Sequence, residues 1–518
     1  MAHRDCTAGP GHSRPGGGGA SGGWGGCAAD TLAAVTVRGT VLAIDQGTSG
    51  TKALVVCAQR GVIASAEVAV RPRYGSDGVV EQDPAELLES VLAAGRGALA
   101  ECGEAVDAVG LANQGETVLA WDPATGAPLT DALVWQDRRA ESVCRQLSGD
   151  RGELAALTGL SLDAYFAAPK MAWLRRNLTG DGVVTTSDVW LVHQLTGAFV
   201  TDASTASRTM LLDLDTTGWS VRALEIFALA GERLPAVVDT AGPFGSTTAF
   251  SSGGAPVPLT ASVVDQQAAL AGQGCLTAGT AKCTYGTGAF LLANVGGRAL
   301  RSAAGLTTSV AWRLAGQPTY CLDGQVFTVA SAVRWLVDLG VLSAARDLDR
   351  VAGTVPDAGG VTFVSSLAGL GGPWWRGDAR GSVSGLGLDT TAGHLVRALL
   401  EGIAAQVVEL ADATAADLGA PLASLRVDGG LTRSTQLMQI QADLLQAPVE
   451  VFASPDATAL GAAALARVGL DPTLSLQDAA VAVAPSSVYL PQIGPEQAAD
   501  RRAGFRSAVA RELDRGDR

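Results

Sequence analysis

Short apolar runs alternate with tight polar turns where the chain first shows a clear pattern. Residues 41–44 and 53–57 are apolar runs on either side of a turn rich in glycine, serine and threonine. A third run follows at 61–70, so the pattern predicts two or three strands in series. The pair Asp83-Pro84 is typical of a helix start, and 106–112 predicts another buried strand. The predicted order is strand, strand, strand, helix, strand.

A similar hairpin recurs in the second half of the chain. Residues 282–285 lead into the turn Gly286-Thr287-Gly288, and the apolar run 289–293 follows. A repeat of strand, Gly-Thr turn and strand indicates an internal duplication and two related α/β domains that face each other. Further predicted elements are strands at 306–312 and 318–322 and a helix at 326–340.

The predicted domain limits follow from these patterns. A Gly-rich start with few large apolar groups is predicted to be disordered, because it cannot bury enough surface to offset its ordering entropy. A Gly-rich stretch separates the two domains, and a polar end rich in alanine and arginine predicts a terminal helix. The limits are 1–38 for the extension, 39–273 and 274–485 for the two domains, and 486–518 for the helical tail.

The composition is that of a well-packed globular protein with an acidic surface. Of 518 residues, 47% are hydrophobic and 17% are charged, and the formal net charge is −14. This charge argues against nucleic acid or an anionic membrane as a partner. No apolar run approaches the roughly 18 residues that span a bilayer. The cysteines are scattered without a CxxC pair and the histidines are dispersed, which predicts reduced thiols, a cytoplasmic location and no zinc site. The sequence leaves a homo-oligomer open.

The first turn has the chemistry of a phosphate-binding loop. It reads Asp45-Gln46-Gly47-Thr48-Ser49-Gly50-Thr51-Lys52. Glycine permits a turn in which backbone N–H groups converge, the hydroxyls add donors, and the lysine adds a positive charge. The aspartate ends a buried strand and is a candidate carboxylate for Mg²⁺ near the phosphates. An ordinary hairpin turn would give the same pattern, and the GxxxxGK[ST] sequence of a P-loop is absent.

Two later turns have related chemistry. Gly286-Thr287-Gly288 could clamp a triphosphate from the other side. Val427-Asp428-Gly429-Gly430 ends a predicted strand before a helix, whose N-terminus suits ribose or phosphate oxygens. A ligand-free αβ loop is the more common explanation of the second turn. The small residues at 458–463 either border a flat base or allow close contact between helices.

Asp265 is the candidate catalytic base. It follows the apolar pair Val263-Val264 and precedes a helix-like segment that begins Gln266-Gln267. A carboxylate at such a strand end is anchored by the core, and it can accept a hydroxyl proton as the oxygen attacks a γ-phosphorus. The alternative is a helix N-cap, for which aspartate is favoured.

Together these segments resemble the FGGY carbohydrate kinases, and among them the glycerol kinases, from about Val41 to about Leu470. The matching stretches are Asp45-Gln46-Gly47-Thr48, Val134-Trp135-Gln136-Asp137-Arg138-Arg139, Ala206-Ser207-Arg208-Thr209-Met210-Leu211, Asp265-Gln266-Gln267-Ala268-Ala269-Leu270, Tyr285-Gly286-Thr287-Gly288 and Val427-Asp428-Gly429-Gly430. The resemblance implies an α/β fold with two actin-like, ribonuclease-H-like domains flanking a cleft for ATP and Mg²⁺.

The resemblance also implies roles for individual residues. Asp265 is the catalytic base, and Asp45 and Asp265 are the metal-side carboxylates. The polyol is held in the first domain by Glu116, Trp135, Tyr165, Asp265 and Gln266, together with Phe290. The nucleotide is held by Thr48, Ser49, Lys52, Thr287, Gly430 and Ser434.

One departure concerns the acceptor. Glycerol kinases read Asn-Gln-Arg-Glu-Thr where this chain reads Asn113-Gln114-Gly115-Glu116-Thr117, so a glycine replaces an arginine. Loss of the guanidinium removes about five N–H donors and opens space. This favours an acceptor larger than glycerol, such as a tetritol or pentitol. Alternatively, a nearby basic residue or water takes over, and glycerol 3-phosphate remains the product.

Two other functions are weighed against the polyol kinase. A ketose or aldonate kinase would keep the fold and change the acceptor. A non-catalytic actin-like regulator that binds nucleotide or sugar would be expected to lose the aspartate or to carry a DNA-binding segment. This chain retains Asp265, which favours an enzyme.

Overall fold

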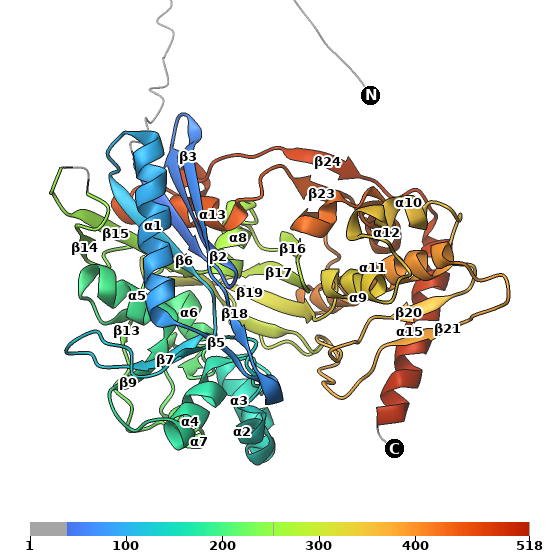
Figure 1. Ribbon diagram of the computed structural model, residues 1–518, viewed down its shortest axis with the longest axis horizontal. Coiled ribbons are helices and arrows are strands. Elements are labelled where there is room, and N and C mark those ends of the chain that lie inside the picture. Colours follow the sequence, from blue (N-terminus) through green and yellow to red (C-terminus); the bar gives the residue numbers. More distant parts are fainter. Residues whose placement is uncertain (1–38, 252, 517–518) are drawn as a thin grey trace, which may run out of the picture. The chain divides into compact units, whose positions relative to one another are not determined.

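The computed structural model describes residues 39–251 and 253–516. The predicted disordered extension, residues 1–38, lies outside the described residues. The described chain forms two large mixed sheets with helices packed on their faces, as Figure 1 shows. The prediction of an α/β fold is confirmed.

The first sheet has the strand order β14-β15-β6-β1-β2-β3. Strands β1, β2 and β3 form antiparallel hairpins, β6 is parallel to β1, and β15 is parallel to β6. The predicted series of three strands, a helix and a strand is confirmed, with α1 (Pro84–Cys102) as the helix. The strands are β1 (Thr40–Gln46), β2 (Gly50–Cys57), β3 (Gly61–Ala69), β6 (Ala108–Asn113), β14 (Ser246–Thr247) and β15 (Val257–Val264).

The second sheet has the order β18-β19-β17-β16-β22-β23-β24. The strands are β16 (Ala281–Tyr285), β17 (Ala289–Gly296), β18 (Thr307–Leu314), β19 (Gln317–Val326), β22 (Leu425–Asp428), β23 (Val449–Phe452) and β24 (Pro485–Tyr489). The predicted helix at 326–340 is too long, because Val326 still belongs to β19 and the helix α9 spans only Ala330–Asp338.

The two sheets repeat one topology. In the second sheet β16 pairs antiparallel with β17 and parallel with β22, as β1 does with β2 and β6 in the first. Both hairpin turns close with a backbone hydrogen bond between glycines. Gly47 N donates to Gly50 O at 3.0 Å, and Gly286 N donates to Gly288 O at 2.8 Å. The internal duplication predicted from the Gly-Thr turns is therefore present in the strand pairing.

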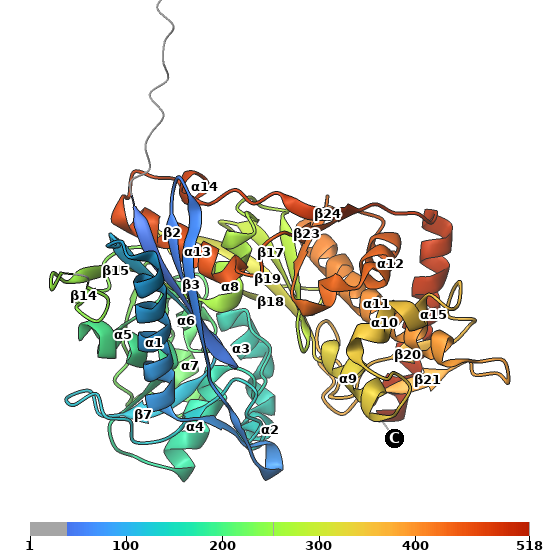
Figure 2. The same cartoon turned by 45° about the horizontal axis from the view of Figure 1, so that its top comes forward.

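The middle of the central strand β1, residues 41–44, is apolar because both faces of the strand are covered. Leu42 and Ile44 pack with α1, whereas Val41 and Ala43 pack with α8 (Asp265–Gly272) and α13 (Ala457–Leu470). Successive side chains of a strand point to opposite faces, so the two helix layers lie on opposite sides of the sheet. Figure 2 shows α8 and α13 side by side.

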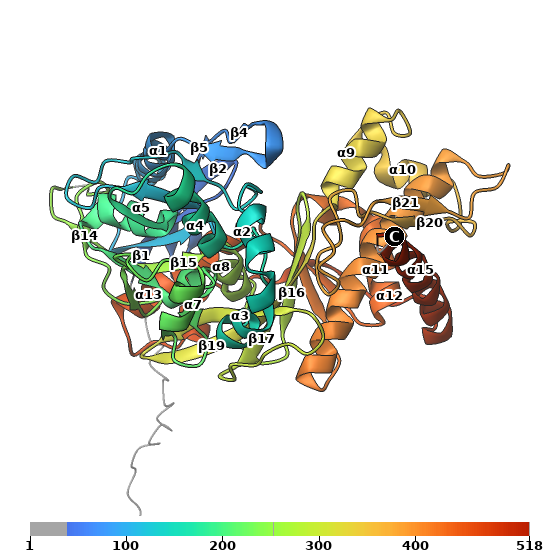
Figure 3. The same cartoon turned by 90° about the horizontal axis from the view of Figure 1, so that it is seen from below.

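Further helices complete the described chain. Helices α11 (Ala392–Leu418), α12 (Thr435–Leu445) and α15 (Pro495–Gly516) lie together near the second sheet (Figure 3). The remaining helices are α2 (Glu141–Gln146), α3 (Arg151–Thr158), α4 (Ala167–Asn177), α5 (Ser187–Thr196), α6 (Ala203–Ser207), α7 (Val221–Ile226), α10 (Leu348–Ala352) and α14 (Leu476–Ala479). Among residues 39–251 and 253–516, no helix has the length and apolar character needed to cross a membrane.

The small sheets were not predicted, because most of their strands are only two to four residues long. One has the order β4-β5-β8-β7-β9, and three others are strand pairs. Their strands are β4 (Arg73–Tyr74), β5 (Val80–Gln82), β7 (Val118–Trp121), β8 (Ala132–Leu133), β9 (Val183–Thr186), β10 (Val200–Asp202), β11 (Leu212–Asp213), β12 (Gly218–Trp219), β13 (Ala236–Val238), β20 (Thr362–Val364) and β21 (Ser382–Ser384).

The contact between α8 and α13 depends on glycine. A Cβ at Gly461 would lie 1.8 Å from Ala268 O, and a Cβ at Gly272 would lie 1.9 Å from Ala457 O. The small residues at 458–463 thus allow the two helix backbones to touch, which was one of the two interpretations of this segment.

Gly461→Ala is expected to lower the free energy of unfolding by about 1–3 kcal/mol, because the added methyl group forces the two helices apart. Chemical denaturation measures this change. Gly504→Ala on α15 is the matched control, because a Cβ there meets no atom within 4 Å. This control should be neutral or slightly stabilising, since alanine favours helix more than glycine does. Equal stability of the two variants would contradict the close-packing argument.

Candidate active site

Three neighbouring parallel strands of the first sheet end together. Gln46 at the end of β1 lies opposite Asn113 at the end of β6, and Val264 at the end of β15 also lies opposite Asn113. The carboxyl ends of parallel strands are where α/β folds bind ligands. Asp45, Glu116 and Asp265 lie in or directly after these strand ends, so the sheet explains why segments far apart in the sequence meet.

A small cavity of about 10 Å³ lies at this edge. This is about the smallest volume that holds a single water molecule. The predicted substrate residues Glu116, Tyr165, Asp265, Gln266 and Phe290 all line it. The other lining residues are Arg208, Val264, Gln267 and Asp323.

The aromatic residues predicted for the substrate form one cluster. The ring of Trp135 lies edge-on to Tyr165, with 5.7 Å between centroids, and edge-on to Phe290 at 6.3 Å. The indole N–H of Trp135 donates to Thr48 Oγ1 at 2.9 Å. This bond ties the predicted substrate-binding aromatic residue to the first Gly-Thr turn.

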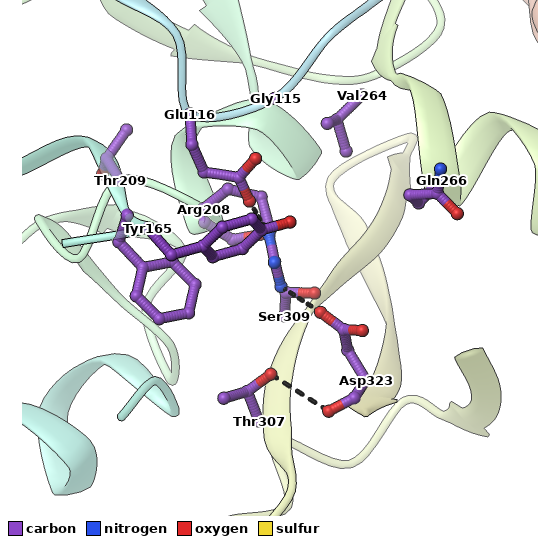
Figure 4. A network of polar contacts seen from close by, with 12 residues as sticks. Gly115, Glu116, Tyr165, Arg208, Thr209, Val264, Gln266, Thr307, Ser309 and Asp323 are labelled. Atoms are coloured by element: carbon purple, nitrogen blue, oxygen red, sulfur yellow. Dashed lines mark hydrogen bonds and ion pairs between the residues drawn. The ribbon is translucent and has the colours of Figure 1, made fainter. Parts of the chain in front are cut away.

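Arg208 is a residue of the cavity that sequence reasoning did not assign to the site. Its Nε donates to Glu116 Oε1 at 2.6 Å, and its Nη1 donates to Asp323 Oδ2 at 2.7 Å. Figure 4 shows the guanidinium between these two carboxylates. The side chains of all three residues are buried, and the guanidinium carbon lies 5.6 Å from the centroid of the Tyr165 ring.

The signal for Arg208 was present in the sequence, because it lies in the quoted stretch Ala206-Ser207-Arg208-Thr209-Met210-Leu211. Glu116 takes a left-handed backbone conformation with φ of +56°, which is uncommon for a residue other than glycine. Burial raises the pKa of its carboxyl group, and the charge and hydrogen bond of Arg208 oppose that rise. The arginine therefore favours the ionised form of a buried carboxylate.

Asp265 is the first residue of α8 and follows β15 directly. The residue at the N-cap position is Val264, so the cap interpretation does not describe Asp265. Its Oδ1 accepts a hydrogen bond from Gln266 N at 2.6 Å. Burial, and then the negative charge of Glu116, raise its pKa to about 7. A carboxylate with a pKa near neutrality is suited to accept a proton at neutral pH.

Comparison with protein-family models matches both halves of the chain. Residues 40–272 match the FGGY family of carbohydrate kinases, N-terminal domain, and residues 281–470 match the C-terminal domain of the same family. The chain belongs to the FGGY family of carbohydrate kinases. The resemblance inferred from the motifs is thereby confirmed.

Individual relatives agree with the family assignment. A glycerol kinase of Thermus brockianus is 42% identical to this FGGY kinase, covering 91% of this chain and 98% of its own. A crystal structure of Plasmodium falciparum glycerol kinase with ADP aligns with a TM-score of 0.84 at 31% identity, covering 92% and 98% of the two chains. A xylulose kinase from Rhodospirillum rubrum aligns with a TM-score of 0.82 at 25% identity, covering 93% and 100%. The predicted two-domain fold is confirmed by these structures.

Two carboxylates of the FGGY kinase fit a magnesium ion. Burial, and then the charge of Asp265, raise the pKa of Asp45 to about 7. The charge of Asp265 thus makes Asp45 costlier to ionise, and a bound divalent cation would remove that cost. In residues 39–251 and 253–516 no group of three or more His, Cys, Asp or Glu could hold a metal. Mg²⁺ needs no such group, since one or two carboxylates usually hold it together with substrate phosphates and water.

Four of the residues predicted for the nucleotide, Thr48, Ser49, Thr287 and Gly430, lie at turns that follow strands of the two sheets. Thr287 is exposed at the turn after β16, and Gly430 is exposed after β22, the strand that pairs in parallel with β16. The turn after β22 lies close to the end of β16, because a Cβ at Gly429 would lie only 2.4 Å from Tyr285 O. Ser49 is exposed and Thr48 partly buried in the first turn.

Two of these residues have other partners within the FGGY kinase. Lys52 forms an ion pair with Asp456, which immediately precedes α13. Ser434 caps α12, because its Oγ accepts from Leu437 N at 3.1 Å and contacts Asp349 Oδ1. Their assignment to the nucleotide stays a prediction.

Proposed function

We propose that this FGGY kinase transfers the γ-phosphoryl group of ATP to a primary hydroxyl of glycerol. The 42% identical glycerol kinase of Thermus brockianus and the Plasmodium falciparum glycerol kinase with ADP support this acceptor and this nucleotide. The reaction consumes ATP and the six cysteines that the structure describes are free thiols, which supports the cytoplasm as its place of action.

The observation that carries the choice of glycerol is the surroundings of Gly115. A Cβ at Gly115 would lie 2.8 Å from Val264 Cγ2, so absence of a side chain at this position leaves no open space. Arg208 already supplies a guanidinium to Glu116. These contacts leave Glu116 with a basic partner and no open space beside it, so they favour glycerol and weigh against a larger acceptor.

The proposed mechanism places each cavity residue in one role. Glu116 and Gln266 hold acceptor hydroxyls, while Tyr165, Phe290 and the adjacent Trp135 contact the carbon chain. Asp265 accepts the proton of the attacking hydroxyl as its oxygen bonds to the γ-phosphorus. The bond from that phosphorus to the bridging oxygen breaks, and ADP leaves with the bonding electrons.

Asp45 and Asp265 would hold Mg²⁺, which supplies charge neutralisation for the phosphates when bound. The two Gly-Thr turns contribute backbone N–H groups and the hydroxyls of Thr48 and Thr287 to the phosphates. Because phosphoryl transfer needs little covalent chemistry from the protein, positioning and charge neutralisation by these residues account for most of the catalysis.

Lys282 sets the orientation of Gln266 in this proposal. Lys282 is buried on β16, and its Nζ donates to Gln266 Oε1 and, at 3.0 Å, to Thr284 Oγ1. A lysine only donates hydrogen bonds, so the atom of the amide that faces it must be the carbonyl oxygen. The amide NH₂ of Gln266 is then left to donate to an acceptor hydroxyl.

Lys282→Met is expected to raise the KM for glycerol about tenfold, which corresponds to the loss of about one hydrogen bond. Steady-state kinetics at saturating ATP measures it. Thr284→Val is the matched control, because it removes the other acceptor of Lys282 and leaves the contact with Gln266. A KM that changes equally in both variants would contradict the orienting role.

A polyol panel with coupled ADP detection tests the proposed function. Glycerol should give the highest kcat/KM among glycerol, erythritol, threitol and the pentitols. ADP release that depends on glycerol supports the kinase. A preference for a tetritol, a pentitol, a ketose or an aldonate would replace the acceptor, and nucleotide binding without acceptor-dependent turnover would favour a regulator.

A further inference from the structure

We propose that Val264 is a specificity-determining residue of the acceptor site, and that Val264 and Gly115 form a matched pair limiting the acceptor to three carbons. The inference rests on the proposed function, because it concerns the polyol bound beside Asp265. It goes further by assigning the size limit to one side chain that makes no hydrogen bond to the acceptor.

The two residues are complementary in size. Gly115 is buried immediately before Glu116. The position of a Cβ on Gly115, 2.8 Å from Val264 Cγ2, is closer than real side-chain carbons approach. A side chain at 115 therefore requires a smaller residue at 264, and the valine occupies the space that such a side chain would need.

The backbone holds the valine in place. Val264 N donates to Ser204 Oγ at 3.1 Å, and Val263 O accepts from Asn113 Nδ2 at 3.0 Å. The β-branched side chain of valine also has few rotamers. Because Asp265 is the next residue, the backbone at Val264 cannot move away from the acceptor without moving the proposed base.

Val264 is also a wall of the cavity that Glu116, Asp265 and Gln266 line, and Figure 4 places its side chain near Gly115 and Gln266. Because protein interiors are close-packed, a change of one or two methyl groups on this wall alters what fits beside it. The valine methyl groups offer no hydrogen bond. The chemistry therefore matches a short polyol whose hydroxyls meet the polar residues and whose carbon chain ends against Val264.

The first experiment measures acceptor selectivity in purified full-length protein. The quantity is kcat/KM for erythritol divided by kcat/KM for glycerol, in the wild type, Val264→Ala and Val263→Ala. Val263 packs in the core on the same strand and does not line the cavity, so it controls for general loosening of β15. We expect the ratio to rise about tenfold or more in Val264→Ala, the scale of a methylene in an apolar pocket. The ratio should be unchanged in Val263→Ala.

A double-mutant cycle tests the matched pair independently of catalysis. Gly115→Ala should lower the unfolding temperature through the clash with Val264, and adding Val264→Gly should restore part of that loss. Additive effects in the cycle would overturn the pairing.

The outcomes separate the inference from the proposed function. A wild type that phosphorylates glycerol, with a Val264→Ala ratio within about twofold of it, overturns the inference alone. A similar rise in Val263→Ala also overturns it. If the wild type phosphorylates no polyol at all, the proposed function is wrong, and the proposed size limit is wrong with it.

Discussion

Asp265→Asn is expected to lower glycerol-dependent turnover by roughly a thousandfold. The amide has the shape of the carboxylate and still accepts from the backbone N–H of Gln266, so the start of α8 should stay folded. It cannot take the proton of the attacking hydroxyl, and it removes one of the two carboxylates proposed for Mg²⁺. Coupled ADP detection measures the rate, and thermal unfolding checks that the variant is folded.

The control for this prediction is Asp83→Asn, the same chemical change at a true helix N-cap. Asp83 caps α1 by accepting from Ala85 N at 2.8 Å, and asparagine caps helices as well as aspartate does. Turnover should stay near that of the wild type. Near-normal turnover in Asp265→Asn would mean that another group accepts the proton.

Arg208→Met is expected to destabilise the protein by about 3–5 kcal/mol, because it leaves Glu116 and Asp323 buried without their shared positive charge. Glycerol binding should weaken as well, since Glu116 loses the partner that orients it. Chemical denaturation and the KM for glycerol measure the two effects.

The stability loss in Arg208→Met should depend on pH. Arg208 opposes the rise of the Glu116 pKa, so without it the folded-state pKa of Glu116 lies further above the unfolded value. Groups with a raised folded pKa bind more protons in the folded state, so the free energy of unfolding rises as pH falls. The difference in the free energy of unfolding between the wild type and Arg208→Met should therefore be smaller at acidic pH than at neutral pH.

The matched control is Arg60→Met, which breaks another arginine–glutamate pair. Arg60 pairs with Glu104 at the surface, where both side chains are about half exposed. Little change in stability is expected there, because exposed ion pairs contribute little. Equal losses in the two variants would show that the buried network does not depend on Arg208.

Much of the site could be predicted because its chemistry is local in sequence. A Gly-Thr turn between two apolar runs, or an aspartate between a strand and a helix, is visible within about ten residues. The strand ends that bring Asp45 and Asp265 together follow from the parallel pairing of β1, β6 and β15. Motifs of this kind also carried the family resemblance.

The missed residues act through long-range contacts. Arg208 meets partners 92 and 115 residues away, and a lone arginine in a helix-like stretch gives no sign of two buried carboxylates. The glycine at 115 predicted lost donors and open space, but that space is filled by Val264, which lies about 150 residues further along the chain. Pairings across strands could not be derived from local patterns.

The place of α13 has a consequence for how the chain folds during synthesis. This helix packs on β1, β6 and β15, and Ala466 O accepts from Thr260 Oγ1 at 2.8 Å. One face of the first sheet therefore stays only partly covered, by α8, until the ribosome has made residue 470. A fragment ending at the predicted boundary near 273 should expose that apolar face and aggregate, so the two halves of the kinase must reach their native state together.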